Sequence, residues 1–265
     1  MRLHRAMMRF QFELVPVDEV EPWGENRNLH WFGLTGGWYC LDVSGIELLR
    51  YTEQTTARRS SAGRRTAPPW ADYYVARLWE DMLQALPYIL ESVPNDLVDT
   101  VTTGWSIDFD DIDNAELLDD PAIDAVTDSY ADRSIDTGYL RFGPELQWWR
   151  TLEPVDTVNV EWRFPIDPDR EIAFTAPLSG RASVRTDEFV SAVTDFDRRL
   201  LEAMQVRVDT IAAAGVPPEI DIDVASLIRE QAERRTWLTQ AMAHRVSTDW
   251  DAVRAGISIL ARHSQ

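Results

Sequence analysis

The spacing of apolar residues changes abruptly at Thr186, and this change constrains the fold more than any other feature of the sequence. Before it, residues 158–164 (VNVEWRF) alternate between apolar and polar side chains, which is typical of a strand with one buried face. After it, apolar residues recur on one helix face as far as Gly215, and Asp187 and Glu188 stand where the helix dipole favours negative charge. This pattern predicts a helix about 40 Å long. Strands combined with such a helix predict an α+β fold.

Strand patterns occur in two parts of the chain, and both indicate antiparallel sheet. In the first part, the glycines of residues 35–37 suit a hairpin turn, and Ser44-Gly45 turns the chain again. In the second part, residues 167–169 (DPD) mark a turn. The expected strands are residues 10–14, 29–34, 38–43 and 46–51 in the first part, and 139–142, 146–152, 155–164, 172–176 and 180–184 in the second.

Three further segments have a helical pattern. Residues 71–92 place apolar side chains on one face, and Pro94 follows as a stop signal. Residues 224–244 are the second segment, and residues 249–262, which follow a capping sequence at Thr248, are the third.

We therefore expect residues 8–265 to form a single α+β domain. In this domain an antiparallel sheet packs against two long helices, residues 71–92 and 187–214, and the C-terminal region is helical. Residues 1–7 continue no pattern and are expected to form a loose N-terminal extension.

The charge of the chain restricts its partners. The net charge is −19, which repels nucleic-acid phosphates and anionic lipid headgroups and attracts basic proteins. A role of the acidic residues in solubility alone is the alternative. No run of about 20 apolar residues is present, so we expect no membrane-spanning segment, and no signal peptide is apparent. The sequence predicts a cytoplasmic protein.

The absence of lysine and the single cysteine exclude several kinds of catalytic and metal-binding site. All 26 Lys and Arg residues are arginine, so a Schiff-base lysine and the lysine of a P-loop are absent. Cys40 is the only cysteine, which excludes an internal disulfide and thiolate zinc clusters, and its apolar neighbours predict a buried, inert thiol. The sequence also lacks dinucleotide, nucleophile-elbow and zinc-protease motifs, and its four histidines are not at metal-binding spacing. We predict no cofactor.

Residues 53–69 are almost free of apolar side chains and are expected to form a flexible loop. This loop holds the one local cluster of positive charge in the chain. The cluster could bind a phosphate or carboxylate group, and a solvated loop is the alternative. Its four arginines are Arg58, Arg59, Arg64 and Arg65.

Residues 106–136 are the most acidic stretch. An EF-hand beginning at Asp108 fails, because Ile112 stands at loop position five and Asp113 replaces the glycine at position six. A divalent-metal site of another geometry remains open, with a plain acidic loop and short helices as the alternative. The candidate ligands are Asp108, Asp110, Asp111 and Asp113.

Two aromatic segments are candidate binding sites. Adjacent strand residues point to opposite faces, so one of Trp148 and Trp149 should leave the core and, beside Arg150, form an interface hot spot. Cover by the protein's own loop is the alternative. A small-molecule pocket is a second hypothesis, against a purely structural role in the core. Its residues would be His30, Trp31, Trp23 and Asp42.

Four segments carry a resemblance to a known family: FQFELVPVDEVEPWG, LHWFGLTGGWYCLDV, PPWADYYVARLWEDML and STDWDAVRAGISILAR. They resemble an actinobacterial family known only as a domain of unknown function, over most of the chain from about Met8. The resemblance implies a bacterial protein and supplies no catalytic residues.

Two functional hypotheses follow from these patterns. The first is a non-enzymatic, acidic binding protein, such as an inhibitor or immunity-type protein that masks a basic partner. The second is a divalent-metal-dependent hydrolase that uses the aspartates of residues 108–113. A structural subunit of a larger assembly is a third reading.

Overall fold

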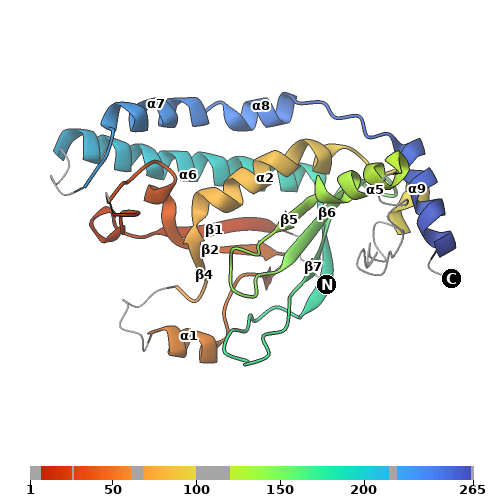
Figure 1. Cartoon of the computed structure of the whole chain (residues 1–265), viewed down its shortest axis with the longest axis horizontal. Helices are drawn as coiled ribbons and strands as arrows, with labels where there is room; N and C mark the ends of the chain where they lie inside the picture. Colours follow the sequence, from red (N-terminus) through yellow and green to blue (C-terminus); the bar gives the residue numbers. More distant parts are fainter. Residues whose placement is uncertain (1–6, 26, 61–67, 100–119, 215–219, 264–265) are drawn as a thin grey trace, which may run out of the picture.

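The structure is a computed structural model that describes residues 7–25, 27–60, 68–99, 120–214 and 220–263. Two four-stranded antiparallel sheets form its centre, and the long helices lie together on one side of them (Figure 1). The predicted α+β class with antiparallel strands is therefore confirmed. The two strand-rich parts form two sheets, whereas we expected one.

The first sheet is built around β2 (Gly36–Val43). β1 (Met8–Leu14) pairs with one edge of β2, and β3 (Ile46–Glu47) and β4 (Ala71–Tyr74) pair with the other, all antiparallel. Phe10 lies opposite Leu41 and Phe12 opposite Tyr39, so these four side chains share one face. That face is the buried one, because Phe10, Tyr39 and Leu41 have almost no exposed surface.

Residues 29–34 do not form the strand that their apolar side chains predict. They lead into a short 3-10 helix, η2 (Gly33–Thr35), and β1 takes the place beside β2. The glycines before Trp38 belong to β2 and do not form a turn. A Cβ on Gly37 would lie 2.3 Å from the carbonyl oxygen of Glu13, so glycine permits the close approach of β1 and β2.

The other turn in this sheet is confirmed, although the strand after it is short. Ser44 and Gly45 have positive φ values of 56° and 87°, as a tight hairpin turn requires. Residues 46–51 were expected to continue as a strand, but β3 ends at Glu47.

The second sheet has the order β5-β6-β7-β8. β6 (Glu145–Thr151), β7 (Thr157–Arg163) and β8 (Ser179–Arg185) confirm three predicted strands, whereas β5 (Ser134–Asp136) was not predicted. Residues 139–142 and 172–176 form no strand. In the latter, the Asp167 carboxylate accepts hydrogen bonds from the backbone N–H groups of Glu171 and Ile172, both at 2.8 Å, and holds the segment as a loop.

Two helices cover the buried faces. α2 (Val75–Leu90) contacts β2, β5 and β6, and α6 (Thr186–Ala214) lies along β1. The helix predicted over 71–92 begins later than expected, because residues 71–74 pair with β2 as β4. None of the helices in the described part of the chain is both long and apolar enough to cross a membrane.

The predicted helix over 224–244 is two helices, α7 (Val224–Arg234) and α8 (Trp237–Ala243). Residues 235–236 interrupt the helix, and Arg234 anchors the chain beside this break. Its guanidinium lies 4.0 Å from the ring centroid of Trp31 and 4.3 Å from that of Trp237, and it forms ion pairs with Glu80 and Glu230.

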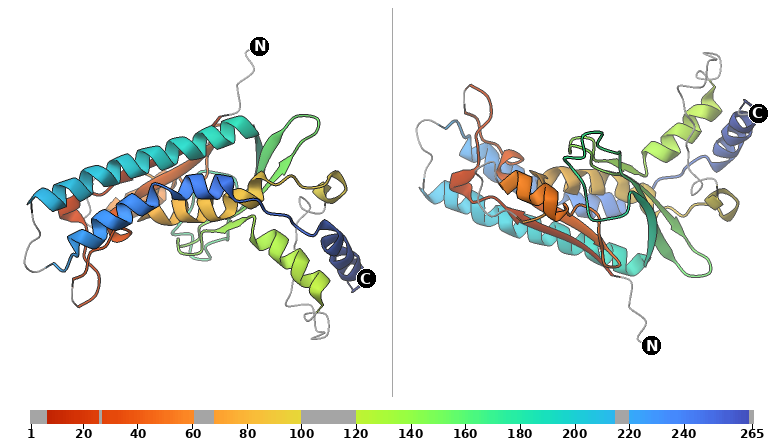
Figure 2. Two further views of the ribbon diagram at one scale, coloured as in Figure 1. Left: turned by 90° about the horizontal axis from the view of Figure 1, so that it is seen from above. Right: turned by 90° about the horizontal axis from the view of Figure 1, so that it is seen from below.

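A smaller second core lies beyond the end of the long helices (Figure 2). It is formed by η3 (Asn95–Leu97), α5 (Pro121–Ala131), α9 (Trp250–His263) and Trp149. α9 confirms the helix predicted over 249–262. It approaches α5 so closely that a Cβ on Gly256 would lie 2.1 Å from the carbonyl oxygen of Ala122.

Candidate functional site

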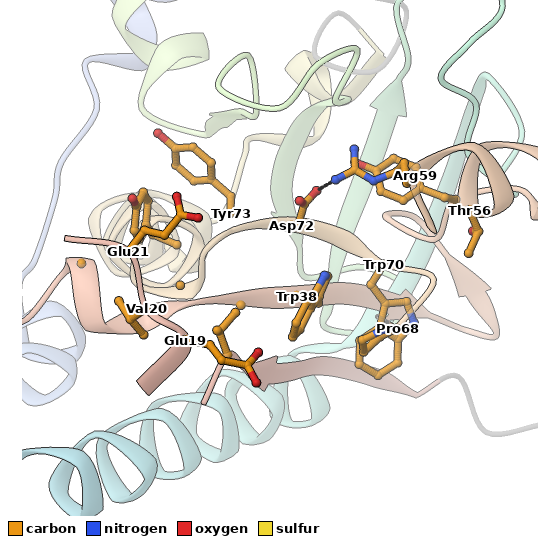
Figure 3. Close-up of a pocket in the computed structure, with 16 residues that line it drawn as sticks. Glu19, Val20, Glu21, Trp38, Thr56, Arg59, Pro68, Trp70, Asp72 and Tyr73 are labelled. Atoms are coloured by element: carbon orange, nitrogen blue, oxygen red, sulfur yellow. Dashed lines mark hydrogen bonds and ion pairs between the residues drawn. The ribbon is translucent and has the colours of Figure 1, made fainter. Parts of the chain in front are cut away.

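A pocket of about 580 Å³ opens on the first sheet, on the side away from the long helices (Figure 3). This volume falls within the range typical of ligand sites. Its walls come from segments distant in sequence: the residues after β1, the start of β2, the end of β4, and α1 (Glu53–Ser60). The aromatic residues that line it are Trp38, Tyr51, Trp70, Tyr73 and Tyr74, and the charged ones are Glu19, Glu21, Arg59 and Asp72.

The alternation of β2 and β4 positions the floor of the pocket. Trp38 and Asp72 are cross-strand partners, so both side chains stand on the same face of the sheet. Tyr39, the neighbour of Trp38, points to the opposite face and is fully buried in the main core. Trp38 therefore lies on the polar face of the sheet and remains half-buried.

The acidic wall follows the short 3-10 helix η1 (Val17–Glu19). Glu21 is exposed, and no described side chain forms an ion pair or hydrogen bond with it. Its carboxylate lies near Tyr74, whose hydroxyl accepts a 2.5 Å hydrogen bond from Trp23 Nε1. Burial raises the pKa of Tyr74, the hydrogen bond from Trp23 opposes the shift, and the Glu21 carboxylate adds a smaller increase.

The opposite wall contains an internal cation. Arg59 extends from α1 to form an ion pair with Asp72, and its guanidinium lies 4.9 Å from the ring centroid of Tyr51. Burial raises the pKa of Tyr51 to about 12, although the charge of Arg59 opposes the shift. Among the residues that the structure describes, three carboxylates and one guanidinium line the pocket, so these side chains together carry a negative charge.

Trp70 contributes an unused hydrogen-bond donor. Its Nε1 atom is buried and has no hydrogen-bond partner among the residues that the structure describes. A buried donor without a partner is costly, so an occupant that offers an acceptor would be favoured here.

The predicted arginine-rich loop is partly a helix. Residues 53–60 form α1, with Thr52 capping its first turn through a hydrogen bond from the Thr55 N–H to Thr52 Oγ1 at 3.3 Å. Arg58 donates to the carbonyl oxygen of Arg170, and Arg59 pairs with Asp72. Arg64 and Arg65 lie outside the described residues, so the anion-binding hypothesis stays a prediction.

The predicted hot spot at Trp148, Trp149 and Arg150 is wrong. The two tryptophans point to opposite faces as expected, but both are buried, with 0% and 1% of their surface exposed. Trp148 lies in the main core and Trp149 in the second core, under the protein's own helices. Arg150 makes a bidentate ion pair with Asp156, at 2.7 Å for both contacts.

The pocket proposed around His30 is not formed by the residues we expected. Trp31 is fully buried, with its Nε1 donating to Gln231, and Asp42 caps the Ser44–Gly45 turn. His30 accepts a hydrogen bond from the Gly33 N–H and packs edge-on against Trp23. These two rings lie beside the pocket described above through the Trp23–Tyr74 contact.

The metal hypothesis is not tested. Asp108, Asp110, Asp111 and Asp113 lie outside the described residues. Within the described ranges, no group of three or more His, Cys, Asp or Glu side chains is placed to hold a metal ion. Cys40 is buried as predicted, and burial raises the pKa of its thiol to about 12, so it is a poor nucleophile at neutral pH.

Sequence reasoning missed the pocket, because its residues are spread over four segments. One signal was present. Trp38 lies two residues before Cys40 and four before Asp42, so a strand places its ring on the same face as the Asp42 carboxylate. The ion pair between Arg59 and Asp72 could not be foreseen without the pairing of β4 with β2.

The fold and pocket define an α+β protein of two antiparallel sheets with an acidic, aromatic pocket on one of them. Comparison with known families places the chain: it belongs to a family of unknown function, DUF5984, which matches residues 9–256. This confirms the resemblance to a domain of unknown function. No curated protein and no solved structure matches the chain.

Proposed function

We propose that this protein is a non-enzymatic binding protein that masks a basic partner protein, and that the pocket around Trp38 receives a positively charged group of that partner. One observation carries the proposal: aromatic rings and carboxylates line the same pocket, in a chain of net charge −19.

Both kinds of side chain favour a cation. An ammonium or guanidinium group is attracted to the face of a tryptophan or tyrosine ring, and more strongly when it is partly desolvated. Glu21 supplies a carboxylate that no described group neutralises. The negative charge of the whole chain would steer a basic partner toward this face at a rate that falls with added salt.

The donor on Trp70 favours a peptide over a free ammonium ion. A cation alone offers no hydrogen-bond acceptor to the buried Nε1 atom, whereas a peptide brings main-chain carbonyl groups as well as its basic side chains. A basic protein segment satisfies the carboxylates, the rings and this donor together. This is how an inhibitor or immunity-type protein would use the pocket.

Calorimetric titration with an end-blocked tetra-arginine peptide tests the proposal. Glu21→Gln is the test variant and Glu25→Gln the matched control, since both glutamates are exposed and both changes remove one charge. We expect the first to weaken binding and the second to leave it near the unmodified value. Equal affinities for the two variants, or equal binding of a tetra-glutamate peptide, would contradict the proposal.

A further inference from the structure

Arg59 lies in the pocket in the way that a bound guanidinium group would. Its ion pair with Asp72 and its contact with the Tyr51 ring, 4.9 Å from the centroid, place one of the chain's own cations on a carboxylate and an aromatic face. All three residues line the pocket (Figure 3). The site is therefore partly occupied by a group of the same charge as the proposed ligand.

The setting of Arg59 differs from that of a structural arginine in the same protein. Arg234 is enclosed between Trp31 and Trp237, and 7% of its side chain is exposed. The Arg59 side chain is 37% exposed and that of Asp72 26%. An ion pair that solvent reaches contributes little to stability, so it exchanges readily with a competing cation.

α1 does not depend on this ion pair for its place. Thr55 is buried, donates to the carbonyl oxygen of Glu171 at 3.2 Å and accepts from the Ala173 N–H at 3.0 Å. Arg58, the neighbour of Arg59, bonds to the carbonyl oxygen of Arg170 at 3.2 Å. The Arg59 side chain can therefore leave Asp72 while the helix stays attached.

The geometry points to an exchange: Arg59 is an internal competitor for the binding site, and an arginine side chain of the partner displaces it from Asp72 and Tyr51. A planar guanidinium matches a carboxylate through two parallel donors and stacks on a ring, which an ammonium group does not do. The inference rests on the proposed function and specifies its ligand class as guanidinium.

Two neighbouring arginines provide the test. Arg59→Ala and Arg58→Ala lower the net charge equally, so a long-range electrostatic effect is the same for both. Titrated with the tetra-arginine peptide, Arg59→Ala should bind about three- to tenfold more tightly than both Arg58→Ala and the unmodified protein, as loss of a weak competing pair predicts. The affinity for a tetra-lysine peptide should increase less on the Arg59→Ala change. Asp72→Asn should weaken the binding of tetra-arginine.

The outcomes separate this inference from the proposed function. Equal affinities of the two arginine variants overturn the exchange, while the effect of Glu21→Gln can still support a cation site. Weaker binding by Arg59→Ala would show that Arg59 is not a competitor. If neither the unmodified protein nor Arg59→Ala binds the peptide, the exchange and the proposed function are both overturned. Binding by Arg59→Ala alone supports the exchange.

Discussion

Trp148 and Trp149 are adjacent in β6, and each is buried in a different core of the protein. The Trp148 ring lies 5.7 Å from that of Phe189 on α6, in the main core. Trp149 packs on the other face with the apolar residues of η3, α5 and α9. One strand therefore joins the two cores through neighbouring side chains.

The two tryptophans should have separable effects on stability. Trp148→Ala removes a fully buried ring from the main core and should lower the free energy of unfolding by about 3–5 kcal/mol. Trp149→Ala should mainly release α9, seen as faster amide hydrogen exchange over residues 250–263 than over α6. Urea unfolding and hydrogen exchange of both variants measure this. Uniform loss of protection in Trp149→Ala would contradict separate cores.

A buried ion pair attaches the C-terminal helix to the rest of the fold. Arg133, 1% exposed, donates to Glu91 at 2.5 Å, and the other oxygen of Glu91 accepts from the Thr248 N–H at 2.8 Å, just before α9. Burial lowers the pKa of Arg133 while Glu91 opposes the shift.

Removing Glu91 leaves a buried charge without its partner. We expect Glu91→Ala to lower the free energy of unfolding by about 3 kcal/mol. The double variant Glu91→Ala with Arg133→Met should recover part of this loss, because no charge then remains buried. Chemical denaturation of the single and double variants tests the coupling, and additive losses would refute it.

Asp197 predicts a pH dependence of stability. Burial raises the pKa of its carboxyl above the ordinary 3.8, although the hydrogen bond from Trp79 Nε1, at 3.0 Å, opposes the shift. The folded state thus binds the proton more tightly than the unfolded state. Stability from this group is present at low pH and declines as pH rises from 3.8 through the folded pKa.

Asp197→Asn keeps an acceptor for Trp79 and removes the ionisation. The variant should be more stable than the unmodified protein near neutral pH, and this difference should vanish at about pH 3. Thermal unfolding across this pH range measures it. A variant that is less stable at neutral pH would show that the ionised carboxylate is stabilising.

The sequence predicted elements whose apolar pattern is local and regular. The helix of residues 186–214 and strands β6, β7 and β8 follow from such patterns. The strand predicted over residues 29–34 is wrong, because an apolar run does not reveal which segment pairs with β2. The actual partner is β1, which lies more than 20 positions before β2 in the sequence. The helix break at residues 235–236 follows Arg234, whose guanidinium packs on the ring of Trp31. No local sequence pattern predicts this long-range contact.

The candidate site was less predictable than the fold. Arg59 stood in the predicted arginine cluster, but its partner Asp72 depends on the pairing of β4 with β2. The Trp148–Arg150 hypothesis failed since periodicity assigns a face to each ring and does not say what covers that face. Here α5 and α9 cover Trp149.

Trp38 should matter for binding more than for folding, because it is half-buried on the polar face of the sheet. Trp38→Leu should weaken tetra-arginine binding by about 1 kcal/mol, roughly fivefold in Kd, through loss of the cation–π contact. Trp38→Phe should keep part of the affinity. Calorimetric titration and thermal unfolding of both variants check this, and a large loss of stability without a change in Kd would contradict it.

The indole N–H resonances of Trp38 and Trp70 in a ¹H–¹⁵N correlation spectrum test the central claim most directly. Trp38→Phe and Trp70→Phe assign the two signals among those of the eleven tryptophans. On titration with tetra-arginine peptide, the proposed site predicts saturable shifts of these two signals that shrink with added salt. Shifts confined to other tryptophans, or none up to saturating peptide, would show that the pocket does not receive the cation.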